Sequence, residues 1–304
     1  MNENISRLKE NILSGTKNVN KIMKGLESIN GNTIIVGTGG SRVVAEFASS
    51  VLSKKNNIIT KVVDSRDLRY MDLTNYKNIF IVSYSGSNFG VKSCFDNDLK
   101  KYLLTHRKSK IDSEELLNYE MASEKSFISI SSSFVPMAIL LKYYYEDKFD
   151  ILIEDIFNRV NKDQYLNIYG EYVNIYSGID TRASASFLET TFAESGLSVP
   201  LIHEKYSYCH GRSTINKSHV ASAIYLGFNG SDLDIAIKDV LDIQMKEYLM
   251  LENIYDDSII NDFYLSLNCL YLLKNIAEAK KINLSDIKYD KDAVRKLYYF
   301  KGSM

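Results

Sequence analysis

The sequence predicts an α/β fold in which parallel sheets are flanked by helices. Uninterrupted apolar runs end abruptly at small polar residues, and apolar residues then recur at helical intervals. An uninterrupted apolar run is typical of a strand that helices cover on both faces. The chain has 304 residues, 45% of them apolar, which is enough for two cores. We therefore expect two domains, residues 1–150 and 151–304, the first opening with one amphipathic helix over residues 2–29.

A first strand–turn–helix unit is predicted over residues 33–52. Its strand, 33–36, leads into Gly39, Gly40 and Ser41. Ligands of such sheets bind beyond the carboxyl ends of the strands, where the N–H groups of a helix favour anions. Arg42 stands where a dinucleotide-binding loop has its third glycine, so a phosphate ester is favoured over a nicotinamide cofactor.

A second unit of the same kind begins with a predicted strand at 79–82. The turn that follows it is made of small polar residues and one tyrosine: Ser83, Tyr84, Ser85, Gly86, Ser87 and Asn88. Two such turns indicate two sides of one phosphate pocket, although each alone also fits an ordinary turn. Further strands are predicted at 58–63, 101–105, 126–130, 172–176 and 220–228, and a helix at 181–195.

These two loops, together with His210-Gly211, resemble the motifs of the sugar isomerase (SIS) domain family. The resemblance implies two tandem SIS domains, each a mostly parallel sheet in a three-layer α/β/α, flavodoxin-like arrangement, and a phosphorylated sugar as ligand. It implies a phosphate site in which Ser87 supports the turn and Tyr84 narrows the pocket if it points inward. The implied phosphate-binding residues are Gly39, Gly40, Ser41, Ser83, Tyr84, Ser85, Ser87 and Asn88, of which Asn88 replaces the family's usual threonine.

The resemblance also implies acid–base chemistry in the second half of the chain. Glu194 precedes His210 by sixteen positions, as do the proton-transferring glutamate and the ring-opening histidine of isomerase-type members. Lys301 is the match for a lysine that those enzymes use near the carboxyl terminus. Desolvation can raise the pKa of a carboxylate towards neutrality, and imidazole exchanges protons there. A helix-end carboxylate and a structural histidine are the alternatives for Glu194 and His210.

Four more residues are candidates for substrate contact: Glu124, Ser129, Glu204 and Arg212. Glu124 and Ser129 match a Glu and a Ser/Thr turn of the family, but capping or surface roles are favoured for both. Glu204 is a second candidate acid/base, and Arg212 replaces the family's proline. His203, Glu204 and His210 do not have the spacing of a common zinc site, so we predict no metal and no cofactor.

Charge and cysteine content narrow the partners and the compartment. The 37 basic and 38 acidic residues create no large field of one sign, which argues against nucleic acid or a membrane as partner. The three cysteines are widely spaced and suggest no disulfide framework. Neither a membrane-spanning stretch nor a signal pattern stands out. We therefore predict a cytoplasmic protein with a small ligand.

Two functions from different classes stay open. The first is an enzyme, an aldose–ketose isomerase or a deglycase acting on a phosphorylated amino sugar or sugar–amine adduct, which Glu194 and His210 favour. The second is a non-catalytic phosphosugar sensor that regulates a partner, which the unusual Asn88, Gly90 and Arg212 favour. The family's histidine commonly reaches the neighbouring subunit's pocket, so the resemblance implies a homodimer with His210 donated across the interface.

Overall fold

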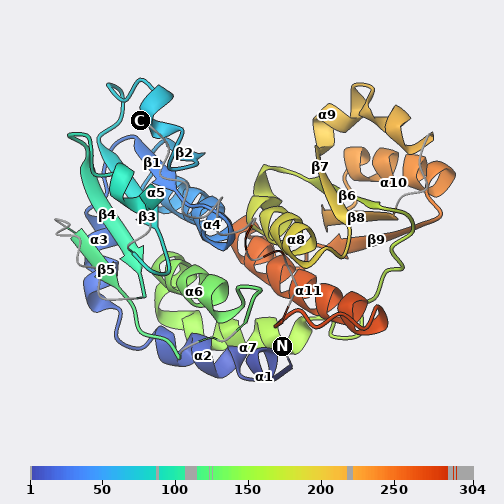
Figure 1. The fold of residues 1–304 in the computed structure, drawn as a ribbon, viewed down its shortest axis with the longest axis horizontal. Coiled ribbons are helices and arrows are strands. Elements are labelled where there is room, and N and C mark those ends of the chain that lie inside the picture. The colour runs from blue at the N-terminus through green and yellow to red at the C-terminus, as the bar shows by residue number, and fades with distance from the viewer. Residues whose placement is uncertain are drawn as a thin grey trace.

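The chain forms two sheets, each made of parallel strands, with a layer of helices between them (Figure 1). The structure is a computed structural model that describes residues 2–86, 89–106, 115–122, 124, 126–217, 222–286, 290 and 292. The predicted α/β class with parallel sheets is confirmed. The division into two tandem domains stays a prediction. One sheet lies wholly before residue 150 and the other wholly after it, while residue 150 itself falls inside a helix.

The first sheet has five strands in the order β2-β1-β3-β4-β5, all parallel. Its strands are β1 (Thr33–Val36), β2 (Thr60–Val63), β3 (Asn78–Val82), β4 (Lys100–Thr105) and β5 (Glu115–Asn118). This is the flavodoxin-like order, in which β2 lies on one side of β1 and the later strands follow on the other side. β1 and β3 are fully buried, as their uninterrupted apolar sequences predicted.

The second sheet repeats the order of the first four strands of the first sheet. It runs β7-β6-β8-β9 and is also parallel throughout. Its strands are β6 (Tyr172–Ser177), β7 (Val199–Glu204), β8 (Ser222–Phe228) and β9 (Glu247–Glu252). The sequence did not predict β7 or β9, because both are partly exposed and lack a continuous buried run.

Helices make up the rest of the regular structure of the described residues. Those of the first half are α1 (Asn2–Ser6), α2 (Leu8–Gly15), α3 (Asn20–Glu27), α4 (Gly40–Lys55), η1 (Leu68–Tyr70), α5 (Phe89–Ser93), α6 (Ser131–Tyr145), η2 (Glu146–Lys148) and α7 (Phe149–Arg159). Those of the second half are η3 (Ile179–Thr181), α8 (Arg182–Ser195), α9 (Lys205–Cys209), η4 (Arg212–Lys217), α10 (Asp232–Gln244) and α11 (Ser258–Ala279). None of these described helices is long and apolar enough to cross a membrane.

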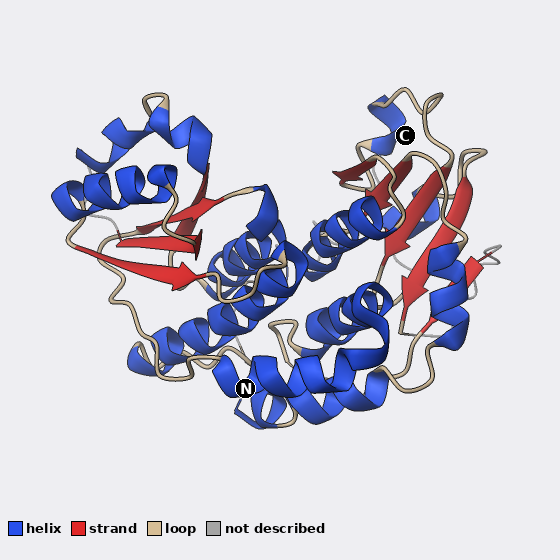
Figure 2. Cartoon of the chain, turned by 180° about the vertical axis from the view of Figure 1, so that it is seen from behind, coloured by secondary structure: helices blue, strands red, loops and turns tan. Residues whose placement is uncertain are grey.

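One continuous hydrophobic core joins the inner faces of the two sheets. Helices α4, α6, α8 and α11 pack against one another in the space between the sheets, as the view from behind also shows (Figure 2). Phe134 of α6 contacts Phe187 of α8 and Phe263 of α11 edge-on, with ring centroids 5.3 and 6.0 Å apart. Each sheet has a separate, smaller core on its outer face. The packing of α4 on α8 brings together segments about 140 residues apart in sequence.

Two predicted elements were wrong. The N-terminal segment is three short helices instead of one, with α2 ending at Gly15, where a Cβ atom would lie 2.6 Å from Val135 Cγ1. The close approach of α6 requires glycine there and coincides with the break. Residues 126–130 are an irregular segment leading into α6 and not the last strand, which is β5.

Candidate functional site

The two polar loops meet at one edge of the first sheet. β1 and β3 are adjacent and parallel, with Val36 paired with Ile81, so the loops that follow them leave the same edge side by side. This is the point where the strand order reverses, and ligands of open α/β sheets bind there. The topology therefore brings the two turns together at one candidate site.

The loop after β1 presents the start of α4. Gly39 is the N-cap of α4 and has φ 58° and ψ −135°, a conformation that favours glycine. Glycine has no side chain that could accept from the first N–H groups of α4, of which that of Arg42 donates to the Gly39 carbonyl oxygen at 2.8 Å. Gly39 is exposed, and Gly40 and Ser41 are half-buried beside it. Thr38 Oγ1 donates to Asp64 Oδ2 at 2.9 Å, which ties the loop to the end of β2.

The loop after β3 folds back on itself. Ser83 is buried, and its hydroxyl accepts a hydrogen bond from the Gly86 N–H at 3.1 Å, so Ser83 supports the turn. The Tyr84 ring stacks on His106 at the end of β4, with centroids 5.2 Å apart. Ser85 is half-buried in the same turn. Ser87 and Asn88 lie outside the described residues.

Glu194 reaches this edge from the second half of the chain. It lies in the last turn of α8, and a Cβ atom at Gly39 would be 3.9 Å from its Oε1. The side chain is accessible to solvent, yet protein lies around it on several sides. That partial burial raises the pKa of its carboxyl group. A carboxylate with a raised pKa beside a helix N-terminus is suited to proton transfer next to a bound anion.

Glu124 and Ser129 lie near the same loop with different roles. Ser129 Oγ would be only 2.8 Å from a Cβ atom at Gly40, so its hydroxyl lies beside the start of α4. Glu124 accepts hydrogen bonds from the N–H groups of Ile130, Ser131 and Ser132 at 3.0–3.1 Å. The carboxylate of Glu124 therefore covers the N-terminus of α6, which is the capping role that the sequence favoured for it.

His210 lies far from Glu194 within one chain. Since β6 and β7 are parallel, α8 returns to the starting edge of the second sheet, and Glu194 lies there. β7 then crosses the sheet over six residues, about 20 Å, before α9 and His210 follow at the opposite edge. His210 and Arg212 are exposed there. Glu204 is the N-cap of α9 and accepts from the Ser207 N–H at 2.9 Å, a helix-capping role.

The remaining predicted site residue, Lys301, lies outside the described residues. Among the residues that the structure describes, no three His, Cys, Asp or Glu side chains are grouped as metal ligands.

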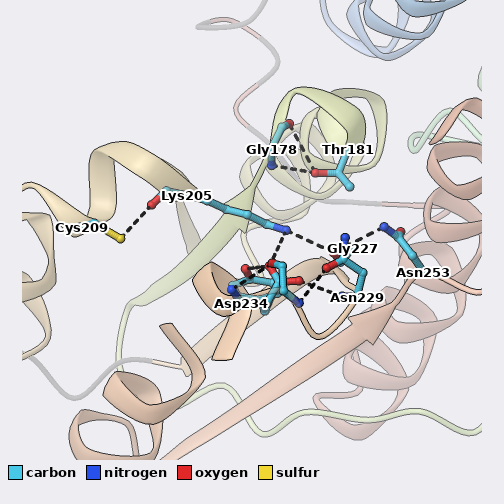
Figure 3. A network of polar contacts seen from close by, with 10 residues as sticks. Gly178, Thr181, Lys205, Cys209, Gly227, Asn229, Asp234 and Asn253 are labelled. Carbon is cyan, nitrogen blue, oxygen red and sulfur yellow. Dashed lines mark hydrogen bonds and ion pairs between the residues drawn. The ribbon is translucent and has the colours of Figure 1, made fainter. Parts of the chain in front are cut away.

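The structure also places at the strand ends polar residues that were not among the predicted site residues. Asp64 and His106 flank the two loops from the ends of β2 and β4. In the second sheet, Lys205 and Asp234 form a buried ion pair where β6 and β8 end (Figure 3). A polar residue directly after a predicted strand is the sequence feature that could have identified such positions. Lys205 could not be identified in this way because the sequence did not predict β7, the strand that precedes it.

No family model matches the chain, and no curated protein matches it in sequence. Solved structures with the same fold were found. A protein from Clostridium difficile 630, itself a proposed phosphosugar isomerase, has a TM-score of 0.72 and 17% identity over 97% of this chain and 96% of its own. Glucosamine-6-phosphate deaminase from Thermotoga maritima has a TM-score of 0.72 and 14% identity over 94% and 97%. Tagatose-6-phosphate ketose/aldose isomerase from Escherichia coli has a TM-score of 0.70 and 12% identity over 95% and 95%. The predicted resemblance to SIS-domain proteins is confirmed at the level of the fold.

Proposed function

We propose that this chain is a phosphosugar enzyme, an aldose–ketose isomerase or a deglycase acting on a phosphorylated amino sugar or sugar–amine adduct. One observation carries the proposal: Glu194, with a raised pKa, lies beside Gly39 at the edge where the two polar loops meet. The structural neighbours named for glucosamine 6-phosphate and tagatose 6-phosphate reactions support the same substrate class.

The phosphate group of the substrate would bind against the start of α4. The N–H groups of this 16-residue helix carry the positive end of its dipole, and the hydroxyls of Ser41 and Ser85 stand beside them. Ser129 borders the same space across Gly40. Such a site neutralises a dianion mostly with backbone dipoles, so it does not require a metal or a cofactor.

Glu194 would move the proton of the sugar skeleton. Converting a ketose to an aldose requires a base that takes a proton next to a carbonyl and returns it one carbon along. A carboxylate whose pKa is raised towards the working pH is an efficient base and also a competent acid. Its place beside the phosphate loop would put it against the first carbons of a bound chain whose phosphate rests on α4.

His210 would open the sugar ring in the pocket of a partner subunit. Within one chain it lies about a strand length from Glu194, so it can serve this chemistry only from a second copy. We therefore propose a homodimer. Mixing inactive Glu194→Gln and His210→Ala proteins should then restore about a quarter of the activity, because half of the dimers are mixed and each has one complete site. No recovery after subunit exchange would contradict the shared site.

The catalytic role of Glu194 is tested with Glu194→Gln and the matched control Glu189→Gln, an exposed carboxylate on the same helix. Both are assayed for product and thermal shift with fructose 6-phosphate, glucosamine 6-phosphate and a fructosamine 6-phosphate. We expect turnover to fall about 10²- to 10⁴-fold in the first variant and to stay unchanged in the second. Wild-type turnover of one of these sugars that survives Glu194→Gln would refute this role.

A phosphosugar sensor is the second candidate. The wide separation of Glu194 and His210 in one chain favours it, since a monomer would hold the phosphate site without the full acid–base pair. Thermal stabilisation by a phosphosugar, with no product from wild type and no response to Glu194→Gln, would support this function over the enzyme.

A further inference from the structure

The switch point of the second sheet is closed by the chain's own side chains. It lies between β6 and β8, in the position that the phosphate loops occupy in the first sheet. In the first sheet the corresponding loop is exposed at Thr38 and Gly39. In the second sheet Lys205 enters from the end of β7 and meets Asp234 from the start of α10 (Figure 3). Lys205 is 7% exposed and Asp234 only 2%.

Lys205 connects several elements at this edge. Its Nζ donates to the Gly227 carbonyl oxygen of β8 at 3.2 Å, lies 3.4 Å from Asp234 Oδ1, and stands 4.4 Å from the centre of the Tyr225 ring. Asp234 also accepts from the Tyr225 hydroxyl and, at 2.8 Å, from the Asn229 N–H. Burial lowers the pKa of the Lys205 amine, while Asp234 and Asp180 oppose that change. Removal of the amine would leave a buried carboxylate without its cation, which is costly.

Lys205 is also the first residue of α9, the five-residue helix that precedes His210. Tyr208 anchors the other end, with its ring edge-on to Tyr176 at 4.6 Å. The His210 N–H bonds back to the Ser207 carbonyl oxygen at 3.2 Å, while its side chain is exposed. Helix α9 is too short to hold its shape alone. The position of the imidazole therefore depends on how α9 is fixed to the sheet.

We propose that Lys205 is a positioning residue: its buried ion pair with Asp234 fixes α9 to the second sheet and so holds His210 ready for the pocket of the partner subunit. This rests on the proposed function of His210. It also explains why an ion pair fills the place that a ligand would take in the first sheet. In this proposal the switch point of the second sheet holds α9 and His210 in position, and the switch point of the first sheet binds the substrate.

The test compares Lys205→Met with Lys205→Arg and with Lys238→Met, which removes an exposed lysine paired with Asp242 on α10. Steady-state kinetics on the sugar that wild type converts are combined with hydrogen–deuterium exchange of the backbone amides. We expect Lys205→Met to lower kcat about 10- to 100-fold, with KM within about twofold, because a displaced group costs rate more than ground-state binding. In Lys205→Met the backbone amides of residues 206–210 should exchange faster than in wild type, and those of residues 33–52 should exchange at the wild-type rate. Lys205→Arg should recover part of kcat. Lys238→Met should match wild type in both kcat and exchange.

The proposal would be overturned if Lys205→Met had the same kcat as wild type and the same amide exchange at residues 206–210. A rise in KM with kcat intact would also overturn it, since Lys205 would then contact the ligand. Failure of the proposed function looks different: wild type converts none of the sugars, or His210→Ala is as active as wild type. In either case exchange at 206–210 still decides whether Lys205 fixes α9.

Discussion

Replacing Gly39 by alanine tests the phosphate loop directly. Gly39 has φ 58° and ψ −135°, which an L residue adopts only under strain. The added Cβ atom would meet Glu194 Oε1 at 3.9 Å, an ordinary van der Waals distance. The penalty therefore comes from the backbone and not from a steric clash.

The structure sets the size of the expected effects. A residue held in such a region costs about 1–3 kcal/mol, and each kcal/mol lowers Tm by about 1.5–2 °C in a chain of this size. If the loop relaxes to relieve the strain, the first N–H groups of α4 turn away from the phosphate. Loss of one hydrogen bond to a charged group costs about 1.5–3 kcal/mol, which corresponds to roughly a 10- to 100-fold weaker affinity.

The assay combines thermal unfolding with phosphosugar affinity, and Gly230→Ala is the matched control. Gly230 also has a positive φ, 76°, with open space where a Cβ atom would go, but it lies in the loop after β8 in the second sheet. Both variants should lose stability, and only Gly39→Ala should lose affinity. Equal affinity losses, or wild-type affinity in Gly39→Ala, would refute the assignment of the α4 N-terminus as the phosphate site.

Three further predictions concern single side chains. Ser83→Ala removes the hydroxyl that accepts from the Gly86 N–H, so it should lower the free energy of unfolding, measured by urea denaturation, by about 0.5–1.5 kcal/mol. Partial burial disfavours the charged form of the Glu194 carboxyl group, so Glu194→Gln should raise Tm at pH 7. Below about pH 4 the carboxyl group of wild type is protonated and neutral like the glutamine amide, so Tm should not rise there. In wild type, kcat/KM should begin to fall on acidification at a higher pH than for a glutamate with an ordinary pKa. Burial raises the pKa of Asp262 from 3.8 to about 7, so the folded state binds its proton more tightly than the unfolded state does. The free energy of unfolding of wild type should therefore fall relative to Asp262→Asn between about pH 4 and pH 7, by up to roughly 4 kcal/mol, and a difference that is flat with pH would contradict this.

Local patterns in the sequence were sufficient for the frame of the candidate site. β1 and β3 are contiguous apolar runs followed at once by the polar residues of the loops, so strand and loop could be predicted together. The same rule failed at residues 126–130, where Ile128 and Ile130 are buried in an irregular segment. It also missed β7, a partly exposed edge strand, and with it the position of Lys205.

Hydrophobic spacing along this chain determined which segments fold as buried strands and helices and where polar residues end them. It did not specify which helix packs on which, because burial of an apolar face is non-directional and many partners satisfy it equally. Only the tertiary packing of α4 on α8 placed the Glu194 carboxylate beside Gly39. Only the parallel course of β6 and β7 placed His210 at the other edge of the second sheet. Glu194 and His210, which the sequence motif had suggested act together, are therefore far apart within a single chain.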